Sequence, residues 1–387
     1  MNGAPAKPKR CRMGLLEPLP LGSTIGILGG GQLGRMSAMA AARLGYRCHI
    51  FAPESDSPAM QVCTASTIAA YEDVEALHNF ADAVDVVTFE FENVPAGTIN
   101  ALEGRVPCRP GTRALSICQD RLVEKRFLTE AGVPVAPWRR VENETDLAAA
   151  LAEIGLPAVL KTTRMGYDGR GQAVLRSLED AAPAFARLAP RPLILEAFVP
   201  FTAEVSAIAV RGMDGAVAVF DVVENRHRDH ILDLSFAPAR VPAATAAAAR
   251  HNVARVASAL QLVGVVALEM FLLPDGGLLG NEIAPRPHNS GHWTMDACAC
   301  GQFEQHIRAV VGLPLGPVTR HADAVMRNLV GPGGLAAWPG LVARPDIVAH
   351  WYGKAEAKPG RKLGHANRLL ALGGLAGLDD VTACDGM

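Results

Sequence analysis

The chain has 387 residues, of which 49% are hydrophobic and 20% are charged, and its formal net charge is −2. This length predicts two or three domains with ample core, and the near-neutral balance excludes both a nucleic-acid-binding surface and a largely disordered chain. No apolar run approaches the roughly 18 uncharged residues that cross a bilayer, so no membrane partner is expected. The eight cysteines are scattered without a Cys-x-x-Cys pair, which favours reduced thiols and a cytoplasmic protein.

Residues 1–21 begin with basic side chains but lack an apolar core, so we expect a disordered or loosely packed extension rather than a signal peptide. An apolar strand over 23–28 then leads into Gly29-Gly30-Gly31-Gln32-Leu33-Gly34 and a helix over 35–43. A second strand at 47–51, with Glu54 twenty residues past Gly34, completes the dinucleotide-binding pattern. A glycine loop at a helix N-terminus binds any phosphate, so the pattern does not by itself select NAD.

Two carboxylates follow the next buried strand, over 84–89. Glu90 and Glu92 lie at the carboxyl end of this strand, the edge at which open α/β sheets bind ligands. The alternative for Glu92 is that it only caps the following helix. Residues 22–119 therefore predict a small doubly wound parallel-sheet domain, with a last strand and helix near residues 102–117.

The next helix is expected to begin at Asp120-Arg121 and to expose Lys125 and Arg126 to solvent. Glycine and proline residues over 132–137 then interrupt the chain. An amphipathic helix over 146–154 is expected to cover the sheet that follows.

A second glycine-rich loop follows Lys161. Residues 158–160 form an apolar run that delivers this lysine to a loop with glycines at 166, 169 and 171, and an apolar run resumes at 173–175. Glycines let backbone N–H groups approach phosphate oxygens, and the lysine can contact the same phosphates. Taken alone, the loop could be a polar hairpin. However, only seven lysines stand against thirty arginines, and none lies between Lys161 and Lys354, which favours a chemical role.

A buried strand over 193–199 contains a single acid, Glu196. A carboxylate in such a strand is costly unless it accepts hydrogen bonds, for which an adenine amino group or ribose hydroxyls are suitable donors. Glu204 follows in an alternating strand over 203–210. His227 comes shortly afterwards in a polar stretch, where a site residue and a solvated loop residue both remain open.

The most informative pattern is a hairpin of strands over 265–273 and 278–283. With Asp275-Gly276 as the central pair of a type I′ turn, residues whose numbers sum to 551 face each other. Glu269 and Glu282 satisfy this sum, which predicts two carboxylates about 5 Å apart at Cβ. Like charges this close require a cation, and Mg²⁺ bridging nucleotide phosphates fits the oxygen ligands. A turn shifted by one residue would separate them.

The polar segment after this hairpin contains Arg286, which could instead pair with one of the two glutamates. His288 and His292 have the spacing of a zinc pair, but no glutamate follows the first histidine and Pro287 opposes a helix. An anion-binding loop built on Arg286, with small polar residues such as Asn289, fits better.

A helix over 302–311 is expected to pack behind this loop, and short strands and turns are expected beyond Leu315. Lys354 follows two aromatic residues and is a site candidate. Lys358 and Lys362 are expected on the surface.

Four motifs in this order resemble the N5-carboxyaminoimidazole ribonucleotide synthetases, a family of ATP-grasp enzymes in purine biosynthesis: residues 29–36, 166–172, 281–293 and 351–354 with 359–365. The resemblance implies an α/β (α+β) architecture with an ATP-grasp fold, a doubly wound N-terminal domain and a small C-terminal β-rich domain. The expected boundaries are 22–119, 120–316 and 317–387, after the extension 1–21. It implies the carboxylation of aminoimidazole ribonucleotide by bicarbonate and ATP, through carboxyphosphate, in a cytoplasmic homodimer.

The resemblance also implies residue roles. ATP contacts would fall on Arg121, Lys161, Gly166, Tyr167, Asp168, Gly169, Arg170, Gly171, Gln172, Glu196, Ala197, Phe198, Val199, Glu204, His227, Asn281 and Glu282. Two Mg²⁺ ions, or Mn²⁺ in their place, would fall on Glu269 and Glu282, although Ala284 stands where many relatives carry an asparagine. Catalytic candidates are Glu90, Tyr167, Arg170 and Lys354. Substrate contacts would come from Gln32, Leu33, Arg286, Asn289, Lys354 and Arg361.

Two other classes remain open. An NAD(P)-dependent oxidoreductase would use the first glycine loop and Glu54, but it leaves Glu269, Glu282 and the second loop without a role. A non-catalytic nucleotide-binding regulator would bind ATP without turnover. Within the ATP-grasp group, a formyl-transferring or biotin-type carboxylating relative is the nearest alternative.

Overall fold

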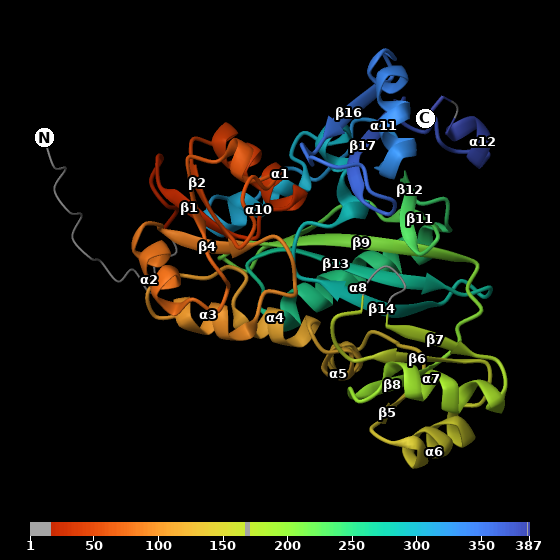
Figure 1. Ribbon diagram of the computed structural model, residues 1–387. Coiled ribbons are helices and arrows are strands. Elements are labelled where there is room, and N and C mark those ends of the chain that lie inside the picture. Colours follow the sequence, from red (N-terminus) through yellow and green to blue (C-terminus); the bar gives the residue numbers. More distant parts are fainter. Residues whose placement is uncertain (1–16, 167–170, 385) are drawn as a thin grey trace, which may run out of the picture.

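The computed structural model describes residues 17–166, 171–384 and 386–387, which form three sheets and their covering helices (Figure 1). The first sheet is parallel, in the order β3-β2-β1-β4. Its strands are β1 (Thr24–Leu28), β2 (Arg47–Ala52), β3 (Ala65–Ile68) and β4 (Val86–Phe89). Its helices are α1 (Gln32–Arg43), α2 (Val74–Asp82), α3 (Ala96–Leu102) and α4 (Thr112–Cys118). The doubly wound domain is confirmed, but the strand expected near residues 102–117 is only an isolated bridge between Val87 and Cys108.

The second sheet is small and antiparallel, in the order β5-β8-β6-β7. Its strands are β5 (Trp138–Val141), β6 (Ala158–Thr162), β7 (Gln172–Leu175) and β8 (Leu193–Ala197). Helices α6 (Glu144–Ile154) and α7 (Ala181–Leu188) pack on this sheet, and α5 (Arg121–Glu130) precedes it. The paired strands on either side of the Lys161 loop are therefore confirmed.

The third sheet has nine antiparallel strands and forms the centre of the molecule. Its strands are β9 (Ala203–Arg211), β10 (Val217–Val219), β11 (Val223–Arg228), β12 (Ile231–Ala237), β13 (Gly264–Leu272), β14 (Leu278–Ala284), β15 (Asp323–Val330), β16 (Ile347–Trp351) and β17 (Lys362–Leu370). The remaining helices are α8 (Ala243–Leu260), α9 (Thr294–Ala297), α10 (Gln302–Val311), α11 (Gly331–Val342) and α12 (Asp380–Ala383).

Helices cover both faces of the central sheet, because alternate residues of its strands point to opposite sides. Val205, Ala207 and Ala209 of β9 pack beneath α8, whereas Ile208 and Val210 pack with Trp293 on the other face. Helix α8 was not predicted, because its alanine-rich sequence shows little difference in polarity between its faces.

The C-terminal strands continue the central sheet rather than forming a sheet of their own, because β15 pairs with β12. The expectation of only short strands and turns beyond Leu315 is wrong, since β15 and β17 have 8 and 9 residues and α11 has 12. Helix α11 contains four glycines and two prolines, so helix propensities do not predict it. None of the helices in the described ranges is long and apolar enough to cross a membrane.

Residues 17–21, the described end of the N-terminal extension, are attached to the body of the molecule. The backbone N–H of Leu19 donates to the carbonyl oxygen of Val311 at 2.8 Å, and the Tyr46 hydroxyl donates to the Leu19 carbonyl at 3.0 Å. Residues 1–16 lie outside the described part of the chain.

Candidate active site

A cavity of about 720 Å³ lies where the three sheets approach one another. Most of the predicted site residues that the structure describes line it: Gln32, Leu33, Glu90, Arg121, Lys161, Gly166, Gln172, Glu196, Ala197, Phe198, Val199, Glu204, His227, Glu269, Asn281, Glu282, Arg286 and Asn289. Gly171, Lys354 and Arg361 are not among its lining residues. Tyr167, Asp168, Gly169 and Arg170 fall outside the described residues.

The first glycine loop holds a carboxylate of the protein itself. Glu90, at the end of β4, accepts hydrogen bonds from the backbone N–H of Gly31 and, at 2.9 Å, of Gly34. A Cβ atom at Gly31 would lie 2.5 Å from a Glu90 carboxylate oxygen, so this approach requires glycine. Burial raises the pKa of Glu90 despite these two hydrogen bonds. Two N–H donors of the dinucleotide-binding pattern are therefore occupied. Glu54, the acidic residue of this pattern, is exposed and does not line the cavity.

The small sheet contributes a buried network around Glu196. Its Oε2 atom lies 3.1 Å from Nζ of Lys161 and 3.2 Å from Nζ of Lys125. Burial opposes ionisation, but the two lysines outweigh it and hold the pKa of Glu196 at about 2. Its Oε1 atom is buried and has no hydrogen-bond partner among the described residues, which leaves an unused acceptor on a residue that lines the cavity.

Lys125 was wrongly expected to be solvated. Its side chain is fully buried and also donates to the carbonyl oxygen of Asn281 at 2.8 Å. Lys125 stands four residues after Arg121, which shares its helix face, and this spacing is the signal that could have identified it.

Glu269 and Glu282 face each other in the β13–β14 ladder, as predicted. The turn that led to this prediction is wrong, however. Leu273 pairs with Gly277 around a three-residue loop in which Gly276 has φ +85°, so near the turn the paired numbers sum to 550. An irregularity between Met270↔Gly280 and Glu269↔Glu282 inserts Asn281 as an extra residue and restores the facing pair.

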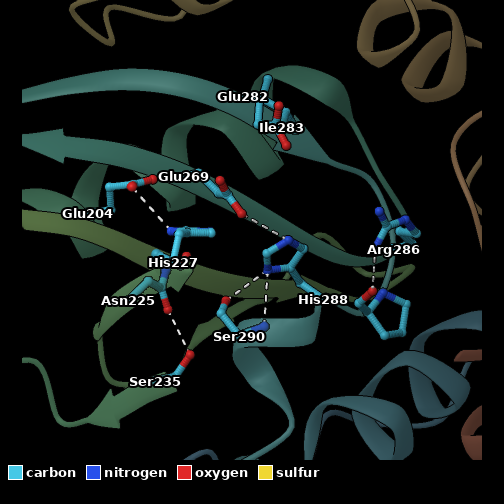
Figure 2. Close-up of polar contacts among 12 residues, drawn as sticks. Glu204, Asn225, His227, Ser235, Glu269, Glu282, Ile283, Arg286, His288 and Ser290 are labelled. Carbon is cyan, nitrogen blue, oxygen red and sulfur yellow. Dashed lines mark hydrogen bonds and ion pairs between the residues drawn. The ribbon is translucent and has the colours of Figure 1, made fainter. Parts of the chain in front are cut away.

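Each of these two carboxylates has a nitrogen-bearing side chain as its neighbour. Nε2 of His288 lies 3.1 Å from Glu269 Oε1, a contact that is drawn in Figure 2. Nη1 of Arg121 lies 3.5 Å from Glu282 Oε2. Burial and the charge of Glu269 raise the pKa of Glu282, whereas the His288 hydrogen bond lowers that of Glu269 against the effect of burial. Two carboxylates that repel each other beside this cavity fit Mg²⁺, which takes one or two carboxylates plus phosphate oxygens.

The part of the cavity beside Glu269 combines apolar walls with a polar pair. Phe201 and Phe271 stack with ring centroids 4.8 Å apart, and Phe198 lines the same cavity. Nδ1 of His227 lies 3.2 Å from Glu204 Oε1, as Figure 2 shows. Burial lowers the pKa of His227, but the bond to Glu204 outweighs it and raises the pKa above the usual value. This environment suits a flat aromatic base next to hydroxyl groups.

Arg286 pairs with Glu92. Two alternatives from the sequence were that Glu92 only caps the following helix and that Arg286 pairs with Glu269 or Glu282. The Arg286 Nε atom donates to Glu92, and α3 has no side-chain cap. Arg286 therefore pairs with neither Glu269 nor Glu282. The two histidines of the zinc-like spacing face different partners: the His292 ring lies tilted against the His365 ring, with centroids 4.6 Å apart, and Nε2 of His288 lies 3.1 Å from Glu269. The described residues contain no group of three or more potential metal-ligating side chains.

The segment that follows β16 contains three further lysines, Lys354, Lys358 and Lys362. Burial and the neighbouring charge of Arg361 lower the pKa of Lys354 to about 8, while Glu90 opposes this shift. Lys358 is exposed and pairs with Glu356, as expected. Lys362 was wrongly placed on the surface, because it is half-buried and lines the cavity.

Three protein-family models match successive parts of the chain. The ATP-grasp domain model matches residues 126–303, the ribonucleotide synthetase preATP-grasp domain model matches 22–119, and the phosphoribosylaminoimidazole carboxylase C-terminal domain model matches 324–371. The three sheets and the cavity between them are thus those of an ATP-grasp ligase.

The chain belongs to the N5-carboxyaminoimidazole ribonucleotide synthase family. It is 52% identical to the Brucella melitensis synthase over 90% of this chain and 96% of that protein. An ADP complex of N5-carboxyaminoimidazole ribonucleotide synthetase matches with TM-score 0.87 and 44% identity, covering 91% and 93% of the two chains. The Aspergillus clavatus enzyme in complex with ADP and 5-aminoimidazole ribonucleotide matches with TM-score 0.84 and 32% identity, covering 90% and 94%. The family assignment decides against the oxidoreductase and the regulator.

Proposed function

We propose that this chain catalyses the reaction for which its family is named. It carboxylates 5-aminoimidazole ribonucleotide with bicarbonate and ATP, giving N5-carboxyaminoimidazole ribonucleotide, ADP and phosphate. The single observation that carries this proposal is the Glu269–Glu282 pair, which faces the same cavity as the Lys161–Glu196 network. Carboxylates for a cation and a lysine for phosphates are the parts that phosphoryl transfer requires.

The nucleotide would lie between the small and central sheets. The base would occupy the apolar part of the cavity near Phe198, where the free Glu196 Oε1 could accept from its amino group. Lys161 and Arg121 would contact the phosphates, together with the loop 166–172. Bound Mg²⁺ would neutralise charge on the transferred phosphoryl group, held by Glu269 and Glu282.

The reaction has two chemical steps. A bicarbonate oxygen attacks the γ-phosphorus of ATP, the bond to the β-phosphate oxygen breaks, and ADP leaves with that electron pair. The product is carboxyphosphate. The exocyclic amine of the ribonucleotide then forms a bond to the carboxyl carbon, or to the CO₂ released from it, while phosphate leaves and the amine loses a proton. Lys161 stabilises the charge that develops in the first step.

The substrate end of the cavity would be built from Glu90, Gln32 and Leu33. Glu90 already accepts hydrogen bonds from the N–H groups of Gly31 and Gly34. A ribonucleotide phosphate would therefore accept from the N–H groups of Gln32 and Leu33, at the start of α1. Arg361 and Lys354 would face it from the other side, with Arg286 and Asn289 contributing nearby. Tyr167, Arg170 and Lys354 would hold bicarbonate and the intermediate. Because carboxyphosphate hydrolyses readily, the site must keep water away from it.

We also propose the domain boundaries 22–119, 120–316 and 317–387 after the extension 1–21, and a cytoplasmic homodimer. These proposals rest on the family resemblance.

The proposed reaction predicts a strict requirement for both small substrates. Release of ADP and phosphate should require bicarbonate and aminoimidazole ribonucleotide together, because bicarbonate is the phosphoryl acceptor of the first step and the amine is the carboxyl acceptor of the second, in a site that excludes water. A coupled ATPase assay that omits each substrate in turn measures this. Full ATP turnover without aminoimidazole ribonucleotide, or quenching of nicotinamide fluorescence on binding, would contradict the proposal.

A further inference from the structure

The side of the sheet to which Glu282 points depends on the irregularity in β14. In a regular strand, residues an even number apart share a face, so Glu282 would point the same way as Leu278. Leu278 and Ile283, five residues apart, nevertheless pack into the same core beneath α8, whereas Ala284 packs on the opposite face. The extra residue, Asn281, therefore reverses the alternation and turns Glu282 towards Glu269.

Strand β14 lies at the edge of the central sheet, so its outer backbone groups must find partners outside the ladder. Two consecutive residues of α5 supply them on either side of Glu282. Nζ of Lys125 donates to the Asn281 carbonyl oxygen at 2.8 Å, and Oε1 of Glu124 accepts from the Ile283 N–H at 2.6 Å. The N–H of Gly280 donates to the Pro134 carbonyl oxygen at 2.7 Å.

Both side chains are buried, and Lys125 also contacts Glu196 at 3.2 Å. Glu124 is 2% exposed and Lys125 is fully buried, so a lost partner would leave a buried polar group unsatisfied. Glu124 also lines the cavity, but the oxygen that bonds to Ile283 is directed at the backbone of β14.

We propose that Glu124 and Lys125 are positioning residues for the divalent-cation pair, which hold the bulged segment of β14 so that Glu282 keeps facing Glu269. A bulge that relaxed to regular pairing would turn Glu282 towards the α8 core and leave Glu269 as the only carboxylate at the cation site. This inference rests on the proposed function, because it assigns a role to residues that act through Glu282.

The test compares ADP binding by calorimetry in Mg²⁺ and in EDTA, so that no catalysis is required. The dissociation constant in EDTA divided by that in Mg²⁺ reports the contribution of the cation to ADP binding. Replacing Glu124 with methionine removes the acceptor and should reduce this ratio about 10- to 100-fold, as expected for a residue that orients a metal ligand. Glu124→Gln keeps an acceptor oxygen and should restore a ratio close to that of the unmodified protein.

Glu224→Met is the matched control. Glu224 is also buried, at 4% exposed, but it pairs with Arg240 away from the cavity, so its loss should lower stability and leave the ratio unchanged. If Glu124→Met does not fold, Lys125→Met must show the same fall in the ratio.

An unchanged ratio in a folded Glu124→Met protein would overturn the inference, and so would an equal fall in Glu224→Met. If the unmodified protein bound ADP equally in Mg²⁺ and EDTA, the cation pair of the proposed function would itself be refuted.

Discussion

Replacing Glu282 with alanine should lower kcat by about 10²- to 10³-fold or more, the range found when one preorganised charge-stabilising group is lost. Glu282 is half of the carboxylate pair that faces the cavity, and its partner Glu269 is held by His288 at 3.1 Å. Without Glu282, a bound cation would keep one protein carboxylate and its position against the phosphates would be lost. Steady-state ATP turnover with both co-substrates measures the effect.

Glu153→Ala serves as the control for this variant, because Glu153 is exposed and pairs with Arg139 on the far side of the small sheet. Its activity should equal that of the unmodified enzyme. Near-normal turnover in a folded Glu282→Ala protein would remove the central residue from the proposed site.

Replacing Lys161 with methionine should reduce kcat/KM for ATP by about 10²- to 10³-fold, because the variant loses the cation expected at the transferred phosphoryl group. Methionine keeps the unbranched side chain apart from its terminal ammonium group, and Lys125 remains as a partner for Glu196 at 3.2 Å. The loss should therefore appear in catalysis more than in folding, which thermal unfolding of the same sample checks.

Lys358→Met is the matched control for Lys161, since Lys358 is exposed and pairs only with Glu356 among the described contacts. A fall in kcat/KM of the same size in both variants would show that the effect is not specific to the nucleotide site.

Sequence patterns located most of the cavity because each motif lies in a strand or directly after one. Lys161 is the second-last residue of β6, Glu90 follows β4, and Glu269 and Glu282 lie within β13 and β14. Apolar runs and glycines mark these positions locally, so one chain is sufficient to find them. The contacts between the motifs depend on how the sheets are placed. The carboxylate of Glu90 reaches the glycine loop because β1 pairs with β4, which neither motif indicates alone.

The hairpin shows where local reasoning ends. The facing of Glu269 and Glu282 was predicted from a two-residue turn, whereas the protein uses a three-residue turn and a bulge whose effects on register cancel. The bulge is held by Glu124 and Lys125, more than 150 residues earlier in the chain. The polar character of the α5 sequence favours solvation, because a lysine on a helix is usually solvated, and only the four-residue spacing of Lys125 from Arg121 indicates otherwise.

The position of a bound cation tests the central claim most directly. Crystals grown with ADP and Mn²⁺ should show an anomalous peak at coordination distance, roughly 2.1 Å, from carboxylate oxygens of both Glu269 and Glu282 and from a phosphate oxygen of ADP. A cation bound away from both carboxylates, or a Glu282 side chain turned towards α8, would contradict the account.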